Sequence, residues 1–295
     1  MGTPDINWYT GVIAASPKAM KFVISNADEL AGLAEIVNAN KDNFAGKTIT
    51  LIGNIDLSQY DNWVPIGSYA DDHNKKFSGT FDGAGHVISK LTINCALGYK
   101  GLFGYICGGK VKNLGLNDAR ISGGEDVGSV AGSVGNYSSL TNCYSTGEVS
   151  GTNKVGGIAG NVTNNSTITG CYSTCVVSGT NKIGGIVGAA SYSDIVKCAA
   201  LSPEVKGAGV FGRVAGSIDS SQAVSKNVAY AGMTKKDGGT NWSRKGAADG
   251  ADITAAEIRA DGTIKGLFSA AADWAVEPGS LPGFRGEPVP MPAYI

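Results

Sequence analysis

Two glutamates have the spacing that comes closest to a catalytic pair in this sequence. Hydrolysis of a glycosidic bond uses two carboxyl groups roughly 5–10 Å apart in a cleft. Glu148 and Glu204 occupy one position of a 28-residue repeat, two repeats apart, which corresponds to roughly 9.6 Å at the spacing of stacked strands. Arg120 and Val176 hold the same position in the other repeats, beside a column of apolar residues. We therefore interpret the position as a solvent-exposed ladder, with an ion pair between Arg120 and Glu148.

A second place for catalysis is the first third of the chain, which is irregular and rich in aspartate. If these carboxylates met in one cleft, the chain would be a carbohydrate-active enzyme. If they were dispersed on loops, that hypothesis would fail. The aspartates are Asp56, Asp61, Asp71, Asp72 and Asp82.

The two histidines do not form a metal site. His73 and His86 are 13 residues apart, and neither begins a His-Glu-x-x-His motif, which places two zinc ligands and a general base on one helix. No cysteines have the Cys-x-x-Cys spacing, and none lies near a histidine in the sequence. We predict no catalytic residue, no metal site and no cofactor. His86 follows a glycine-rich turn, for which a structural role is expected.

Three of the six cysteines recur at one position of the repeat, namely Cys143, Cys171 and Cys198. Leu114 and Val228 hold this position in the first and last repeats, which predicts that the column faces the core. Parallel side chains at the strand spacing of about 4.8 Å have poor disulfide geometry. We expect reduced thiols that pack as small apolar side chains.

The elements that position all these residues follow from the 28-residue repeat. Its runs are short, β-branched and bounded by glycine, which indicates strands and turns. One repeat cannot bury its own apolar face, so the repeats must stack. We predict an all-β fold, a parallel β-solenoid of 28-residue coils with glycine at the corners, often at positive φ. The glycine columns are Gly104, Gly132, Gly160, Gly188 and Gly216, and Gly123, Gly151, Gly179 and Gly207. Two apolar columns are Tyr99, Val127, Val155, Ile183 and Phe211, and Leu102, Val130, Ile158, Ile186 and Val214.

We divide the chain into three segments. Residues 1–98 are expected to hold a first strand, a capping helix and irregular first coils. Residues 99–230 form the regular coils. Residues 231–295 are expected to hold an irregular excursion and a closing cap, with helical turns over 254–260 and a terminal plug.

The capping helix is predicted to begin after Ser25 and Asn26 and to end near Asn38. Asn and Ser are preferred N-cap residues, and one face of the segment is apolar. An exposed strand edge invites aggregation, so a helix over the open end of the solenoid is expected.

The candidate ligand-binding residues are Lys154, Lys182, Tyr144 and Tyr172. The turn Gly-Thr-Asn-Lys ends at Lys154 and again at Lys182, forming a ledge of hydroxyl, amide and ammonium groups. Tyr144 and Tyr172 each follow an inward cysteine, so we expect their rings to point outward and to stack. A purely structural role, as a solvated turn and an aromatic ladder, is the alternative. Further aromatic residues that could stack on sugars are Trp8, Tyr9, Trp63, Tyr69, Tyr137 and Tyr192.

The charge is low and balanced. Lys and Arg number 24, Asp and Glu 25, and charged residues make up 17% of the chain. A basic patch for nucleic acid or an anionic membrane is therefore not expected. No apolar run approaches the 18 or so residues of a membrane-spanning helix. Polar residues follow Met1-Gly2 at once, so we expect any export signal or anchor to lie outside these 295 residues.

The glycine-rich segments resemble the GLUG motif of bacterial secreted and surface proteins. They read GLFG, GSVAG, GGIAG, GGIVG and GRVAG, and the preceding ISNADELAGLAEIVN, GKTITLIGNIDLS, NWVPIGS and FSGTFDGAGHVISKLTIN are similar too. Such repeats occur in adhesin-like proteins and in regions of immunoglobulin A1-specific metallopeptidases, whose peptidase motif is missing here. The resemblance covers most of residues 7–290. It implies a right-handed β-helix and an extracellular, surface-associated setting, and it implies a scaffold rather than an activity.

Two functional hypotheses follow. The first is a non-catalytic secreted or cell-surface module, which either binds host or matrix glycans or proteins or serves as a structural stalk. The second is a region of an immunoglobulin A1 peptidase-like or carbohydrate-active surface enzyme. The low charge and the missing catalytic residues favour the first. We expect a monomer that binds no nucleic acid, spans no membrane and has a host glycan or protein as its partner.

Overall fold

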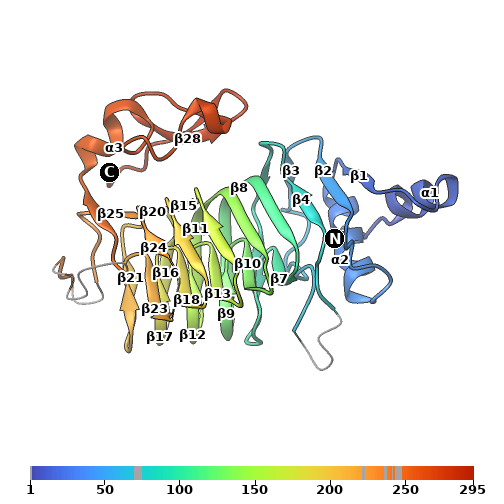
Figure 1. The fold of residues 1–295 in the computed structure, drawn as a ribbon, viewed down its shortest axis with the longest axis horizontal. Coiled ribbons are helices and arrows are strands. Elements are labelled where there is room, and N and C mark those ends of the chain that lie inside the picture. Colours follow the sequence, from blue (N-terminus) through green and yellow to red (C-terminus); the bar gives the residue numbers. More distant parts are fainter. Residues whose placement is uncertain (1, 70–74, 221–222, 236–237, 241, 243–247) are drawn as a thin grey trace.

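The computed structural model is a parallel β-solenoid whose coils stack along the long axis of the molecule (Figure 1). It describes residues 2–69, 75–220, 223–235, 238–240, 242 and 248–295. The N-terminal helices lie at one end of the stack, and the C-terminal segment leaves the last coils and runs back along the flank of the stack. The predicted all-β solenoid is confirmed.

Three parallel sheets form the faces of the coils in the described part of the chain. The 5-stranded sheet contains β7 (Phe103–Cys107), β10 (Ala131–Gly135), β13 (Ala159–Thr163), β18 (Val187–Ser191) and β23 (Ala215–Asp219). The 4-stranded sheet contains β9 (Glu125–Gly128), β12 (Asn153–Gly156), β17 (Asn181–Gly184) and β22 (Phe211–Gly212). The 17-stranded sheet contains β1 (Lys21–Ile24), β2 (Thr48–Leu51), β3 (Ile55–Asp56), β4 (Thr80–Asp82), β5 (Val87–Ser89), β6 (Thr92–Asn94), β8 (Lys110–Ser122), β11 (Ser139–Ser150), β14 (Thr167–Thr169), β15 (Tyr172–Ser173), β16 (Val176–Ser178), β19 (Asp194–Val196), β20 (Ala199–Ala200), β21 (Val205–Lys206), β24 (Val224–Ser225), β25 (Val228–Tyr230) and β26 (Ala251–Ile253).

Equivalent residues of successive coils pair directly, as the repeat predicts. Val155 of β12 pairs with Val127 in the preceding coil and with Ile183 in the following one, and Ile183 pairs with Phe211. Burying one coil's apolar side chains against the next forms a continuous core along the axis. The column Leu102, Val130, Ile158, Ile186 and Val214 is completely buried within it.

Close approach of two backbones explains the main glycine column. A Cβ on Gly160 would lie 2.3 Å from the backbone nitrogen of Val127, and one on Gly188 would lie 2.3 Å from the carbonyl carbon of Lys154. Real side chains do not tolerate such distances to backbone atoms, so only glycine fits. Positive φ, which we expected at these corners, is not the reason, because the repeat glycines do not have it.

At these corners positive φ occurs instead in the turn residues that face the glycines. Asp126, Lys154 and Lys182 have φ of 54°, 52° and 56°. Each lies in the coil preceding its glycine, so the left-handed turn of one coil and the glycine of the next form a single packed unit.

Two helices cover the N-terminal end. The predicted helix is confirmed as α2 (Ala27–Asn38), and the Asn26 side chain caps it by accepting a hydrogen bond of 3.0 Å from the Glu29 N–H. The other helix, α1 (Asn7–Ala15), was not expected. Its Trp8 ring packs 5.9 Å from Phe22 and anchors α1 to the first coil.

The C-terminal segment contains α3 (Ala255–Asp261), the 3₁₀ helix η1 (Ala270–Ala272) and an antiparallel sheet of β27 (Trp274–Ala275), β28 (Ser280–Phe284) and β29 (Glu287–Pro290). The helical turns predicted over 254–260 are confirmed by α3. The terminal plug is not, because β26 extends the last coil by pairing with β25. The segment that follows β26 lies against the flank of the solenoid instead (Figure 1).

The cysteines are free, and five of the six are buried, the exception being Cys95. Cys143 pairs with Leu114 and faces the core as predicted. Burial raises the pKa of the Cys171 and Cys198 thiols well above the usual range, which makes them unreactive.

The last residue of the cysteine column is Asn227, and the prediction of Val228 was wrong. The buried Asn227 side chain accepts a hydrogen bond of 2.8 Å from the Cys198 N–H. Val228 pairs with Ala199 on the outer face. A shift of one residue reverses which face a strand residue occupies, so a small insertion in the coil is enough to cause the error.

Replacing Gly188 by alanine should lower the free energy of unfolding by about 3 kcal/mol or more, because the new Cβ collides with backbone that is held in a ladder on both sides. Urea unfolding followed by circular dichroism measures the change. Gly11→Ala is the control, since no atom lies within 4 Å of its added Cβ and it lies in α1. It should be neutral or stabilise by up to about 1 kcal/mol. Equal free energies of unfolding for the two variants would show that the backbone contact at Gly188 does not require glycine.

Candidate functional site

Tyr144 and Tyr172 stack as predicted but are not exposed. Their rings are 5.2 Å apart at an interplanar angle of 7°, and they point away from the solenoid core. Their exposed fractions are nevertheless only 4% and 0%. The expectation of two solvent-facing rings was therefore wrong.

The C-terminal segment covers the two tyrosines. Phe284 lies 5.8 Å from the Tyr144 ring, and Trp274 lies 5.8 Å from the Tyr172 ring. The Tyr172 hydroxyl donates a buried hydrogen bond of 2.5 Å to the carbonyl oxygen of Pro282. The tyrosine ladder is thus the platform on which residues 254–295 dock.

Lys154 and Lys182 have different surroundings despite their equivalent turns. The Lys154 ammonium lies 3.1 Å from Asp126 Oδ1, as an ion pair rather than an aligned hydrogen bond. Asn161 donates to the other carboxylate oxygen at 3.3 Å. Burial raises the pKa of Asp126, and Lys154 opposes this by favouring the charged form. No carboxylate in the described part of the chain lies within ion-pair distance of Lys182.

The glutamate ladder forms in the predicted register, with one change of partner. Glu148 pairs with Arg120 and Val176 on the adjacent strands. The Arg120 guanidinium, however, bonds to Asp118 at 3.3 Å, two residues away on its own strand, and not to Glu148. Glu204 bonds to Lys206 at 2.6 Å. The two glutamates thus lie on an open sheet face and not in a cleft.

The aspartates of the first third have separate partners where they are described. Asp56 bonds to Lys90 at 2.7 Å, and Asp82 bonds to Lys112 at 2.9 Å. Asp61 is exposed. Asp71 and Asp72 lie outside the described residues. No group of three potential metal ligands occurs in the described part of the chain.

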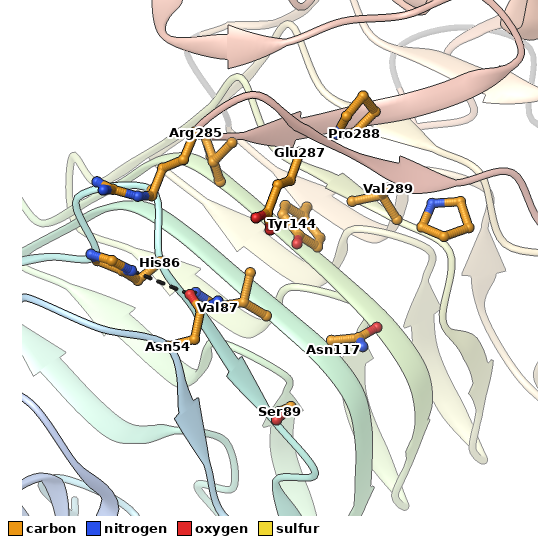
Figure 2. A pocket seen from close by; sticks show the side chains of 13 residues that line it. Asn54, His86, Val87, Ser89, Asn117, Tyr144, Arg285, Glu287, Pro288 and Val289 are labelled. Carbon is orange, nitrogen blue, oxygen red and sulfur yellow. Dashed lines mark hydrogen bonds between the residues drawn. The ribbon is translucent and has the colours of Figure 1, made fainter.

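A polar cleft lies between the β28–β29 hairpin and the flank of the solenoid (Figure 2). Its volume is about 600 Å³. A second hollow of about 530 Å³ lies on the other side of the hairpin tip, and Phe284 and Arg285 line both. The cleft is lined by Asn54, Gly85, His86, Val87, Ser89, Asn117, Tyr144, Phe284, Arg285, Glu287, Pro288, Val289 and Pro290.

His86 and Asn54 form the floor of the cleft at the side of the first coils. His86 Nδ1 lies 3.2 Å from Asn54 Oδ1, and this oxygen also accepts the Val87 N–H at 2.9 Å. Burial and the nearby Arg285 guanidinium lower the pKa of His86. The imidazole is therefore neutral at about pH 7 and can donate or accept through its ring nitrogens.

Arg285 and Glu287 project from the hairpin into the cleft (Figure 2). Arg285 Nη1 donates to the carbonyl oxygen of Ala84 at 3.3 Å, which joins residues 201 positions apart. Glu287 is exposed on the side of Tyr144, and burial together with this carboxylate raises the pKa of Tyr144 to about 12. The cleft therefore presents a cation, an anion and a neutral imidazole.

These groups can form hydrogen bonds and ion pairs with a polar ligand. Among the described residues that line the cleft, Glu287 is the one carboxylate, whereas glycoside hydrolysis needs two. The cleft could not be predicted from the sequence. The local signal for the hairpin is Gly286, because glycine is favoured at the second position of a two-residue hairpin turn. The structure has such a turn, with φ of 55° at Arg285 and 77° at Gly286. No local signal indicates where the hairpin docks.

Comparison with known proteins agrees with the repeat. Residues 123–150, one coil, match the GLUG motif. A stretch of 87 residues is 40% identical to halomucin of Haloquadratum walsbyi, and it covers 29% of this chain and 1% of halomucin. The chain thus corresponds to a very small part of that relative. The resemblance to GLUG-motif proteins is confirmed.

Two solved structures share the fold. A candidate immunoglobulin A1 protease from Bacteroides ovatus superimposes with a TM-score of 0.68 and 23% identity over 93% of both chains. A protein named IgA1 protease superimposes with a TM-score of 0.54 and 19% identity, over 72% of this chain and 16% of that one. Identities this low establish the fold alone. Within the residues described, no helix has the length and apolar character needed to cross a membrane.

Replacing Lys154 by alanine should destabilise the protein by about 1–3 kcal/mol, because it leaves the buried Asp126 carboxylate without its cation. The side chain is 25% exposed, so the loss is smaller than for a fully buried pair. Lys182→Ala is the matched control, with the same turn and φ, and should change stability by less than about 0.5 kcal/mol. Similar losses of stability in both variants would show that the ion pair between Lys154 and Asp126 does not stabilise the fold.

The loss of stability caused by Lys154→Ala should depend on pH. Burial raises the folded-state pKa of Asp126, so the folded chain holds this proton more readily, and stability is lost as pH rises through that pKa. Without the Lys154 ammonium, more stability is lost when the Asp126 carboxyl ionises. The difference from the parent should be larger at about pH 8 than at about pH 4. Thermal melts at both values measure it, and a deficit that does not change with pH would contradict it.

Replacing Tyr172 by phenylalanine should cost about 1–2 kcal/mol, because the buried Pro282 carbonyl loses its donor. Urea unfolding followed by tryptophan fluorescence reports it, since Trp274 lies against this ring. Tyr144→Phe is the control, because its hydroxyl forms no hydrogen bond to a described residue. Equal effects of the two changes would show that the hydrogen bond does not hold the segment in place.

Proposed function

We propose that the chain is a non-catalytic binding module of a secreted or cell-surface protein, and that it holds part of a host or matrix glycan or protein in the cleft beneath the β28–β29 hairpin. The observation that carries this proposal is the hairpin itself. It folds back to Ala84, 201 residues away, and encloses a polar space of about 600 Å³ against the solenoid.

The chemistry of the cleft supports a polar ligand. The Arg285 guanidinium can donate several hydrogen bonds to a carboxylate or to hydroxyl groups. Glu287 accepts hydrogen bonds, and the amides of Asn54 and Asn117 both donate and accept. A few polar groups of this kind among apolar walls fix the orientation of a ligand. Phe284 and Val289 supply such walls.

The residues present favour binding over catalysis. The cleft has one described carboxylate, and the glutamate ladder lies on an open face. The sequence has two histidines and no His-Glu-x-x-His segment, so it lacks the motif of a zinc peptidase. We therefore propose that any catalytic activity resides outside these residues.

The GLUG motif favours an extracellular setting. The shared fold also points to immunoglobulin A1 as a ligand to test. Two proteins that share the fold are described as immunoglobulin A1 proteases, one as a candidate. The narrower version of the proposal is that the module binds immunoglobulin A1 without cutting it, as a monomer.

Binding of the purified protein to a glycan array, to mucin and to immunoglobulin A1, with cleavage followed in parallel, tests the proposal. We expect saturable binding to at least one of them without cleavage. The double variant Arg285→Gln and Glu287→Gln should bind about tenfold more weakly or worse. Arg259→Gln, an exposed change in α3, should bind like the parent.

Two results would overturn the proposal. Cleavage of a glycan or of immunoglobulin A1 would show that the module is an enzyme. Equal binding by the parent and the double variant would show that the ligand does not occupy the cleft.

A further inference from the structure

We propose a second site, independent of the cleft, that binds the repeating chain of a neutral polysaccharide along one corner of the solenoid. The corner lies between β10 and β11, between β13 and β14, and between β18 and β19, in three successive coils. At its tip are residues 136–137, 164–165 and 192, and we call these five residues the tyrosine corner. None of them lines the cleft.

The tyrosine corner holds the two most exposed aromatic rings among the described residues. Tyr137 is 76% exposed and Tyr192 is 56% exposed, and the next is Tyr294 at 36%. Most other aromatic rings, Tyr144 and Tyr172 included, pack into clusters. The two exposed rings thus contribute little to the core.

The backbone at this corner makes tyrosine an unfavourable choice for stability. Tyr137 and Tyr192 have φ of 60° and 49°, in the left-handed region. A bulky residue there costs roughly 1–2 kcal/mol relative to the usual conformation, and Asn and Gly tolerate it best. The coil between them has Asn164 and Asn165 at φ of 55° and 59°. Asparagine would therefore serve the fold, and burial does not compensate for the two tyrosines.

Amide groups lie between and beside the rings. Asn136, Asn164 and Asn165 are exposed, and the Asn164 amide donates to the Asn136 side-chain oxygen at 3.2 Å. Rigid tyrosine rings with adaptable asparagine amides are a composition that binding surfaces use widely. On a sugar, the ring faces take the apolar C–H face, and the amides take the hydroxyl groups.

The geometry of the corner suits a polymer. Successive coils are about 4.8 Å apart, so the two rings lie on rungs about 9.6 Å apart with an asparagine rung between. Similar groups recur along one line, which matches a chain of similar sugar units. A corner of this width is too narrow for the roughly 800 Å² that each partner buries in a stable protein interface.

The charge of the corner favours a neutral chain. The turns over residues 135–138, 163–166, 191–193 and 219–220 contain no Lys or Arg, whereas Asp219 is exposed in the fourth coil. Tyrosine rings also stack on bases, but phosphates need cations to bind. An acidic polysaccharide meets the same obstacle. Neutral sugars do not need a cation to bind.

Electrophoresis in native gels that contain a soluble polysaccharide tests the site. The probes are xyloglucan, galactomannan, mixed-linkage glucan and dextran as neutral chains, with hyaluronan and poly(U) as anionic ones. We expect at least one neutral polysaccharide to retard the protein. The double variant Tyr137→Asn and Tyr192→Asn should bind it about tenfold more weakly or worse.

Matched variants separate this site from other effects. Asparagine already occupies the same turn in the neighbouring coil, so the double variant should fold and melt at the parent's temperature or above. Val64→Asn with Leu97→Asn removes two side chains that are 64% and 70% exposed elsewhere, and should bind like the parent. The two tyrosine substitutions are also made in the cleft variant Arg285→Gln with Glu287→Gln, and the same loss of binding in both backgrounds assigns the polysaccharide to the tyrosine corner and keeps failure of the two sites distinguishable.

The proposal is overturned if none of the neutral chains retards the protein, or if only hyaluronan or poly(U) does. It is also overturned if the tyrosine double variant, shown to be folded by its melting curve, binds within about twofold of the parent.

Discussion

The close approach of two backbones at the repeat glycines is the constraint on which the rest of the solenoid depends. At Gly188 a Cβ would lie 2.3 Å from the Lys154 backbone, and Gly160 and Gly216 repeat this contact against Asp126 and Lys182. Because only glycine fits, the glycine of each coil must lie against the same turn residue of the preceding coil. The facing residue is then held in the left-handed region, and its side chain has a fixed position on the turn. The buried pair of Asp126 and Lys154 is a consequence of this packing and not an independent feature.

Once the coils are in register, ladders of like residues satisfy one another's polar groups. At one buried corner the Ser138 N–H donates to Ser166 Oγ, and the Ser166 N–H donates to Ser193 Oγ. Buried polar groups without hydrogen-bond partners destabilise a fold. Repeating the same side chain in each coil provides a partner for the backbone N–H of the coil before it. The groups left for a ligand are those outside the ladders. Among the described residues, the hairpin residues of the cleft and the rings of the tyrosine corner are groups of this kind, and they are the ones on which our two proposals rest.

Features that recur locally could be predicted from the sequence, and those set by distant packing could not. Residues at an interval of 28 had to be neighbours, which determined the strand register and the inward position of Cys143. The capping helix followed from its N-cap residue, Asn26. By contrast, the burial of Tyr172 depends on Pro282, 110 residues away, and no periodicity links the two. The alternation of strand residues correctly gave the ring's direction, but it carries no information about what covers the ring.

The two kinds of surface differ in the specificity that they can have. A regular solenoid offers nearly the same groups on each rung, so a ligand bound along it is recognised by its repeat and gains by multivalency more than by any single contact. The C-terminal segment removes this equivalence, because its hairpin lies over one place on the flank and adds Arg285 and Glu287 there alone. A site that occurs once can distinguish one chemical group from another. The binding function that we propose therefore assigns selectivity to the irregular segment and recognition of a repeating ligand to the coils. The stacked rings of Tyr144 and Tyr172 join these two parts of the molecule.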